Sequence, residues 1–226
     1  MPGKPRASRR DDILATFVRH VAERGYEQVS MADIAGELGM AQGTIVYHFG
    51  SKAQLLRELE ETYMRRRIAD LKLIWEQLPA PEERVTALIY ATVLLQVVDR
   101  DATIATQREV VQLADDPELL QIRGMRGELT GMLAAELRRG SETGVFRPVD
   151  PDVVTLQIFG SVQWMWTWFD SSGRRTVEEV AATYVDVFLG GLLVDRFALA
   201  RLTDPTGHIP TMVRAALAPA LKTAAS

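Results

Sequence analysis

The segment AQGTIVYHFGSK, residues 41–52, gathers amide, hydroxyl, aromatic and cationic side chains over a very short stretch. Gln42 can form two hydrogen bonds with adenine, and Thr44 can bond a base edge or place its methyl group against a thymine methyl. Gly43 adds no side chain, so the backbone can approach a duplex closely. The types and spacing of these residues therefore indicate contact with DNA bases.

The same segment offers groups for the DNA backbone. Tyr47 and His48 carry donors for phosphate oxygens, which position a protein without reading sequence; half-buried helix residues are the alternative interpretation. Lys52 stands in the first turn of the next predicted helix, where the helix dipole disfavours a cation and a phosphate partner would offset that cost. Ser30, a predicted helix cap, can also donate to phosphate.

Two short predicted helices hold these groups. The first opens at Ser30, whose spacing to Asp33 suits a cap, and Gly39 ends it. The second runs over about 42–48, with Ile45 in the core. Two helices joined by a tight turn that contains glycine are typical of a helix-turn-helix, whose second helix lies in the major groove of DNA.

The stretch GYEQVSMADIAGELGMAQGTIVYHFGSKAQLL, residues 25–56, resembles the N-terminal DNA-binding domain of TetR-family transcriptional regulators. The resemblance implies a homodimeric repressor that binds a double-stranded DNA operator and is released when its body binds a small effector. The sequence departs from the family at Val46, where a tyrosine that often contacts phosphate is usual, so Tyr47 takes more of that role. The positions at which such proteins contact DNA are Ser30, Gln42, Gly43, Thr44, Tyr47, His48 and Lys52.

A basic arm precedes this domain. Lys4, Arg6, Arg9 and Arg10 stand in the first ten residues with no acid among them. Residues 1–52 hold 7 Lys and Arg against 6 Asp and Glu, whereas the remainder holds 19 against 24. A basic arm on an acidic body suggests an anionic partner. Arg9 and Arg10 are therefore candidate DNA contacts, and a solvated tail is the alternative.

The longer apolar patterns have helical period, so we predict an all-α protein of about nine helices. The predicted helices beside the helix-turn-helix pair cover about 9–24, 51–78, 81–99, 102–114, 117–140, 151–169 and 177–200. The predicted organisation is a basic flexible arm at 1–10, a three-helix helix-turn-helix domain at 11–52, a larger helical effector-binding and dimerisation domain at 53–202, and a tail at 203–226 with at most one short helix, such as 212–217.

Three tryptophans in one predicted helix are the unusual feature of the body. Trp164 and Trp168 share a helix face and Trp166 points roughly opposite, so one face could line a pocket and the other a dimer seam; ordinary core is the alternative. The other candidates for effector contacts are Trp75, Tyr90 and Met125. A pocket lined by such side chains favours a small apolar or aromatic effector.

The resemblance also implies a dimer. In the family the last two main helices, here 151–169 and 177–200, usually form a four-helix interface. The run FLGGLL, residues 188–193, fits this role because Gly190 and Gly191 lower helix stability and permit close approach of a second helix. A helix kink is the alternative. Phe188 joins these two glycines as the third dimer candidate.

The effector class rests on a looser similarity. The segments GVFRPVDPDVVTLQIFG and WFDSSGRRTVEEVAATYVDVFLGGLL are similar to the C-terminal part of several regulators in the family, some of which respond to fatty acyl-coenzyme A esters. Drug-responsive members share parts of them. A fatty acyl-coenzyme A is therefore the preferred effector, and a drug- or xenobiotic-responsive efflux regulator is the alternative. Candidate phosphate contacts, or else solvated charges, are Arg123, Arg126, Arg174 and Arg175.

Other functional classes find little support. The sequence has no cysteine, its histidines His20, His48 and His208 lack metal-ligand spacing, and no P-loop, dinucleotide fingerprint or nucleophile elbow occurs. We therefore predict no catalytic residue, no metal and no cofactor. With no apolar run of about 18 residues and no signal-peptide core, we expect a cytoplasmic protein without a membrane partner. A helical protein-interaction module remains the alternative without DNA.

Overall fold

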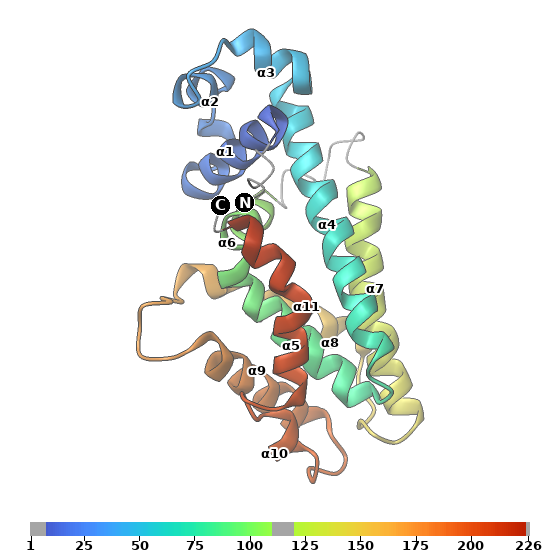
Figure 1. The fold of residues 1–226 in the computed structure, drawn as a ribbon. Helices are drawn as coiled ribbons and strands as arrows, with labels where there is room; N and C mark the ends of the chain where they lie inside the picture. Colours follow the sequence, from blue (N-terminus) through green and yellow to red (C-terminus); the bar gives the residue numbers. More distant parts are fainter. Residues whose placement is uncertain (1–7, 110–119, 225–226) are drawn as a thin grey trace. The chain divides into compact units, whose positions relative to one another are not determined.

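The computed structural model of the chain describes residues 8–109 and 120–224, and apart from one isolated β-bridge its secondary structure there is helical (Figure 1). This confirms the predicted all-α class. The α-helices are α1 (Arg9–Arg24), α2 (Met31–Glu37), α3 (Gln42–Phe49), α4 (Lys52–Glu76), α5 (Pro81–Val98), α6 (Arg100–Arg108), α7 (Leu120–Glu142), α8 (Pro151–Gln163), α9 (Val177–Leu192), α10 (Leu199–Leu202) and α11 (His208–Ala224).

The helices form two compact units. The first unit comprises the described residues up to Met64 together with those from Asp101 to Arg123, so it contains α1, α2, α3, most of α6 and the first half of α4. The second unit comprises Arg65–Arg100 and the described residues from Gly124 onward. Helix α6 therefore belongs with the N-terminal helices, although the second half of α4 and all of α5 separate it from them in sequence.

Helix α1 covers the residues 9–24 that were predicted to be helical, so the arm predicted for 1–10 overlaps its first turn. The Ser8 hydroxyl accepts from the Asp11 N–H, and the Asp11 carboxylate accepts from the Ser8 N–H, which is a complete capping box. Arg9 and Arg10 therefore lie in the first turn of a helix and not in the flexible arm predicted for 1–10. The other predicted arm residues, 1–7, lie outside the described part.

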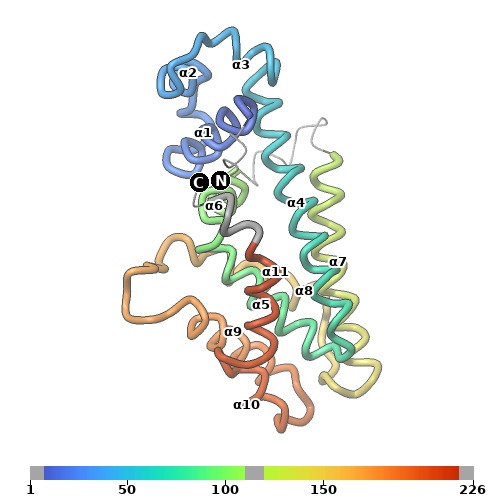
Figure 2. The backbone as a smooth tube through the Cα atoms, in the orientation of Figure 1, coloured from blue at the N-terminus to red at the C-terminus, as the bar shows by residue number. Residues whose placement is uncertain are grey.

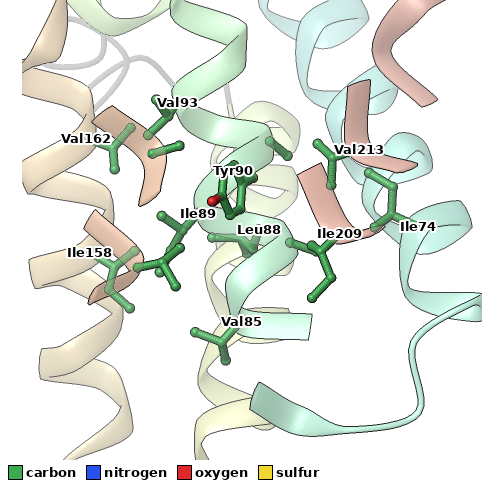
Figure 3. Packing of buried hydrophobic residues seen from close by; sticks show 14 of the residues in the cluster. Ile74, Val85, Leu88, Ile89, Tyr90, Val93, Ile158, Val162, Ile209 and Val213 are labelled. Atoms are coloured by element: carbon green, nitrogen blue, oxygen red, sulfur yellow. The ribbon is translucent and has the colours of Figure 1, made fainter. Parts of the chain in front are cut away.

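The second unit is built around α5, which is buried on nearly all sides (Figure 3). A helix that is apolar all round belongs in the interior of a fold. Its residues meet Ile158 and Val162 of α8 on one side and Ile209 and Val213 of α11 on another. Helix α11 runs beside α5 in both backbone views, and it is much longer than the short segment predicted at 212–217 (Figures 1 and 2).

Two predicted helices end earlier than expected. Helix α8 stops at Gln163 and not near Phe169, because the following turn tightens to a 3-10 helix in which Met165 enters the core. Helix α9 stops at Leu192 and not near Ala200. The Arg147 side chain donates to the Gly191 carbonyl, and an isolated bridge pairs Phe146 with Leu193, so local partners replace the next helical turn.

One glycine in the second unit has a packing role. A Cβ atom added to Gly140 would lie 2.0 Å from the ring of Phe146, which is fully buried. The ring therefore packs directly on the backbone of α7.

Residues 110–114 and 117–119, which were predicted to be helical, lie outside the described part.

Candidate nucleic-acid interface

A capping box fixes the start of α2. The Ser30 hydroxyl accepts from the Asp33 N–H at 3.1 Å, while the Asp33 carboxylate accepts from the Ser30 N–H at 3.0 Å and from its hydroxyl at 2.7 Å. These hydrogen bonds from Ser30 hold the pKa of Asp33 below its usual range. Ser30 is exposed and serves as the predicted cap. Its hydroxyl is committed to Asp33 in this structure.

Helix α3 separates a core face from an exposed face. Ile45 and Phe49 are buried and anchor the helix in the first unit. On the opposite side Gln42 and Gly43 are exposed, and the Tyr47 side chain is 84% exposed. Because Gly43 has no side chain and no atom would lie within 4 Å of a Cβ there, a partner can approach the α3 backbone at this point.

The remaining polar residues of α3 flank this exposed face. Thr44 and His48 are half-buried, and the His48 ring meets the Tyr47 ring edge to face at 5.3 Å between centroids. Val46, at the position where the family usually has tyrosine, is exposed as well. The structure therefore places Gln42, Gly43, Thr44, Tyr47 and His48 on one short helix, of which only the two anchors are buried. Ser30 and Lys52 lie apart from it, at the starts of α2 and α4.

The predicted cations have partners inside the first unit. The Lys52 ammonium donates to the Tyr26 carbonyl at 3.1 Å and lies 4.2 Å from the centre of the Tyr26 ring. The Arg10 guanidinium pairs with Glu58 and lies 4.7 Å from the centre of the Phe49 ring. These contacts fix where the charges of the two cations lie.

A network of charged residues joins α1 to α2. Glu37 accepts from His20 at 2.7 Å and also pairs with Arg19. The hydrogen bonds that Arg19 and His20 donate to Glu37 hold the pKa of Glu37 below its usual range, and the bond that Arg19 donates to Glu37 raises the pKa of Arg19. His20 is buried, and its hydrogen bond to Glu37 ties α1 to the end of α2, where the turn to α3 begins.

The predicted effector contacts occupy different environments. Trp75 and Tyr90 are buried in the core of the second unit, and Met125 is half-buried on α7. Trp164 and Trp168, in contrast, are 65% and 49% exposed. Because α8 ends at Gln163, the shared helix face predicted for these two tryptophans does not form.

Tyr90 stands apart because its hydroxyl is buried and has no hydrogen-bonding partner among the described residues. Burial and the nearby charge of Asp204 raise the pKa of Tyr90 to about 12. The hydroxyl therefore remains protonated at neutral pH and can donate a hydrogen bond. Trp75 already uses its indole N–H, which donates to the Arg84 carbonyl at 3.0 Å.

The predicted dimer residues lie at the end of α9. Phe188 is half-buried and stacks on Tyr184, with 6.3 Å between ring centroids. A Cβ atom at Gly190 would meet Leu199 of α10 at 3.6 Å, whereas nothing would lie within 4 Å of one at Gly191. Of the two glycines, Gly191 is therefore the one whose surface is open to a second chain.

The described residues contain no cluster of three or more potential metal ligands, and no helix among them is long and apolar enough to cross a membrane.

The comparisons with known proteins agree with the geometry of α2 and α3. Residues 13–59 match the family of bacterial regulatory proteins named tetR, and residues 79–192 match the tetracyclin repressor-like C-terminal domain. The chain belongs to the TetR family. It is therefore a transcriptional regulator with a DNA-binding helix-turn-helix, as the sequence predicted, and not an enzyme.

Relatives within the TetR family align over most of the chain. The transcriptional repressor KstR2 of Mycolicibacterium smegmatis is 28% identical over 193 residues, which are 84% of this chain and 93% of that protein. The structure of KstR2 of Mycobacterium tuberculosis superposes with a TM-score of 0.78 at 27% identity, over 84% of this chain and 98% of that one. The structure of AibR in complex with isovaleryl coenzyme A and operator DNA superposes with a TM-score of 0.73 at 28% identity, over 80% of this chain and 97% of that one.

Sequence reasoning missed the partners that Lys52 and Tyr26 have in this TetR-family fold. The Tyr26 N–H donates to the Glu109 carboxylate at 2.9 Å, across 83 residues of sequence. Arg108 reaches the carbonyl of Ala22 at 3.0 Å. No local pattern marks Glu109 or Arg108, because their importance depends on the packing of α6 against the end of α1.

Proposed function

We propose that this chain is a ligand-responsive repressor that binds a pseudo-palindromic operator as a homodimer and is released by an acyl-coenzyme A. The observation that carries the proposal is the exposed face of α3, where Gln42, Gly43 and Tyr47 stand free of the core while Ile45 and Phe49 anchor the helix. The exposed amide of Gln42, next to the backbone at Gly43 that no side chain covers, can reach the edges of bases when α3 lies in the major groove.

The apolar surface of α8 and α9 supports dimerisation. Val153, Leu156 and Trp164 are exposed apolar residues that recur at the spacing of one helical face on α8 and the turn that follows it. Val187 and Gly191 are four residues apart on α9, so they too lie on one helical face. Exposed apolar side chains grouped in this way are typical of an interface.

We accordingly assign Trp164 and Trp168 to the dimer seam and not to the effector pocket. A hydrogen bond from the Tyr184 hydroxyl to the Ser161 carbonyl at 3.0 Å ties α9 to α8, so the two helices offer their exposed residues as one surface. A dimer places two copies of α3 about one DNA turn apart, at roughly 34–36 Å.

Two lines of support point to an acyl-coenzyme A as the effector. AibR, the relative at 28% identity, was crystallised with isovaleryl coenzyme A and operator DNA. In this chain the buried Tyr90 hydroxyl lies within an apolar core and has no protein partner among the described residues. A hydroxyl that stays protonated in such a place suits the carbonyl of a thioester on an otherwise apolar chain.

The effector acts by favouring one of two conformations of the dimer. Operator affinity falls when the ligand binds more tightly to the state whose recognition helices have the wrong spacing. The ratio of operator affinities with and without effector then measures the coupling free energy. An effector that binds both conformations with equal affinity does not release the operator, however tightly it binds.

Displacement of a fluorescent operator tests the effector class. Acyl-coenzyme A esters of increasing chain length are titrated into the protein–DNA complex, with free coenzyme A, the matching carboxylic acids and a panel of cationic drugs as controls. Release by the esters alone supports the proposal. Release by the drugs alone assigns the chain to the drug-responsive regulators and contradicts the acyl-coenzyme A assignment.

A further inference from the structure

Tyr26, in the 3-10 turn Tyr26–Gln28 that follows α1, is held from two sides by charged groups. Its N–H donates to the Glu109 carboxylate at 2.9 Å, and its carbonyl accepts from the Lys52 ammonium at 3.1 Å. The same ammonium lies 4.2 Å from the centre of the Tyr26 ring. Both hydrogen bonds involve an ionised group, and such bonds are roughly twice as strong as neutral ones.

The Glu109 carboxylate is buried, and a charge in such a place is stable only when a hydrogen-bond donor is held against it. Its side chain is buried, with 4% exposure, directly after the last residue of α6. A buried carboxylate needs hydrogen bonds to its charged form, and the Tyr26 N–H supplies one. All of these groups belong to the first unit.

Arg108 strengthens the same junction. It donates to the carbonyl of Ala22 at 3.0 Å and to that of Glu23 at 3.5 Å, at the C-terminal end of α1, where the helix dipole favours a cation. Gly25 follows with a φ of +83°, a conformation that side-chain-bearing residues rarely adopt. The chain thus turns sharply at Gly25 and presents Tyr26 to Glu109.

The position of the Lys52 ammonium depends on this junction. Lys52 is the first residue of α4 and follows α3 after only Gly50 and Ser51. A lysine side chain has a flexible four-carbon stem and about 2 kcal/mol of rotamer entropy. The Tyr26 carbonyl and ring restrict that freedom and leave two of the three N–H donors for an anion.

We propose that Glu109 is a positioning residue for operator binding: it fixes Tyr26, which in turn holds the Lys52 ammonium where it meets a DNA phosphate. The proposal rests on the function proposed above, because it assigns Lys52 a phosphate of the operator. It makes the end of α6 a structural component of the DNA-binding surface, although neither Glu109 nor Tyr26 needs to touch DNA.

A double-mutant cycle tests this chain of contacts. Fluorescence anisotropy gives the affinity for operator and for scrambled DNA over a series of salt concentrations, for the wild type, Lys52→Ala, Glu109→Ala and the double variant. Lys52→Ala lowers the salt slope by about one unit for each chain on the DNA, and therefore by about two units for a bound dimer. When Lys52 is present, Glu109→Ala weakens operator binding about three- to tenfold and lowers the salt slope by less than Lys52→Ala does. When Lys52 is absent, Glu109→Ala has little further effect on either quantity.

Two further variants separate positioning from simple stabilisation. Glu109→Gln keeps an acceptor oxygen without the charge, so its affinity falls between those of the wild type and Glu109→Ala, and it replaces the latter in the cycle if that variant does not fold. Arg108→Ala is the matched control, since the Arg108 guanidinium donates to the carbonyls of Ala22 and Glu23 at the end of α1, whereas Glu109 accepts from the Tyr26 N–H. Its effect adds to that of Lys52→Ala.

The outcomes decide between the proposals. Equal effects of the Glu109 substitutions with and without Lys52, or a salt slope that depends on Lys52 alone, overturn the positioning role while leaving the repressor function intact. A wild-type protein that shows no preference for operator over scrambled DNA contradicts the proposed function itself. Strong coupling between Glu109 and Lys52, together with additive behaviour of Arg108→Ala, supports the inference.

Discussion

At the scale of single residues, the TetR-family recognition helix divides its side chains by what they can contact. Ile45 and Phe49 are buried, and Gln42 and Tyr47 face outward. Base-edge contacts discriminate between sequences, whereas phosphate contacts strengthen binding to all of them. The substitution of a base-reading residue and that of a phosphate contact therefore have different signatures.

Thr44→Ala tests base reading by α3. Thr44 is half-buried near the start of the helix, and its hydroxyl or methyl group is assigned to a base edge. We expect a loss of roughly 1–3 kcal/mol in binding to the operator and little change on scrambled DNA. Anisotropy titrations on both DNAs provide the comparison, and an equal loss on the two would rule out a base-reading role for Thr44.

Tyr90→Phe tests the assigned effector contact. The Tyr90 hydroxyl is buried without a partner among the described residues, so its removal leaves the ligand-free protein equally stable or more stable, by up to about 1–3 kcal/mol. If the hydroxyl binds the effector, about tenfold more acyl-coenzyme A is needed for release, at unchanged operator affinity. Thermal unfolding and operator displacement measure the two effects, and an unchanged effector response contradicts the assignment.

At the scale of elements, the sequence predicted starts of helices better than their ends. Ser30 forms the cap that its spacing to Asp33 predicts, because a cap is a contact between near neighbours, and Thr176 with Glu179 forms a capping box of the same spacing at the start of α9. The end of α9 depends on Arg147 and Phe146, which lie far away in sequence. Tertiary contacts of this kind leave no local signal.

The same distinction explains the outcome at the candidate interface. The face of α3 could be read from residues 42–49 because a short helix with two apolar anchors fixes which side chains point outward. The contact between Glu109 and Tyr26 could not, since it joins residues 83 positions apart. The exposure of Trp164 could not be predicted from the sequence either. It depends on the change from α-helix to 3-10 helix after Gln163, which accompanies the burial of Met165 in the core.

Ser30→Ala tests the cap of α2. Loss of a serine cap costs roughly 0.5–2 kcal/mol of the free energy of unfolding. Because the folded-state pKa of Asp33 is lowered by Ser30, the stability linked to its charge is present above the ordinary pKa near 3.8 and is lost as pH falls through the lower folded-state value.

The difference in unfolding free energy between wild type and Ser30→Ala is therefore expected to shrink as the pH falls below the ordinary value of 3.8 and through the lower folded-state pKa of Asp33. Chemical denaturation at neutral and acidic pH measures the difference. A gap that stays constant into this acidic range would show that Asp33 does not share in the cap.

At the scale of the whole molecule, the proposed function requires two copies of the chain. Leu156 is 68% exposed on α8, within the apolar surface that we assign to the dimer. Leu156→Glu places a charge in that seam and is expected to convert the dimer to monomers, because an unpaired charge is costly to bury. Sedimentation equilibrium measures the mass.

Leu73→Glu serves as the control for the dimer, since Leu73 is an exposed leucine on α4, outside the proposed seam. It is expected to leave the dimer intact. Monomers in both variants, or dimers in both, would contradict the placement of the interface on α8 and α9. Loss of operator binding in Leu156→Glu alone would connect the dimer to DNA recognition.

The central claim is that the exposed face of α3 binds a specific DNA sequence in a dimeric protein. The most direct measurement is a fluorescence-anisotropy titration of the wild-type chain onto the intergenic DNA that flanks its own gene, with scrambled DNA as the control, between about 50 and 200 mM salt. We expect binding that prefers the intergenic DNA, weakens steeply with salt and saturates at two chains, or a multiple of two, per site. An affinity that is the same for both DNAs and does not change with salt would contradict the claim.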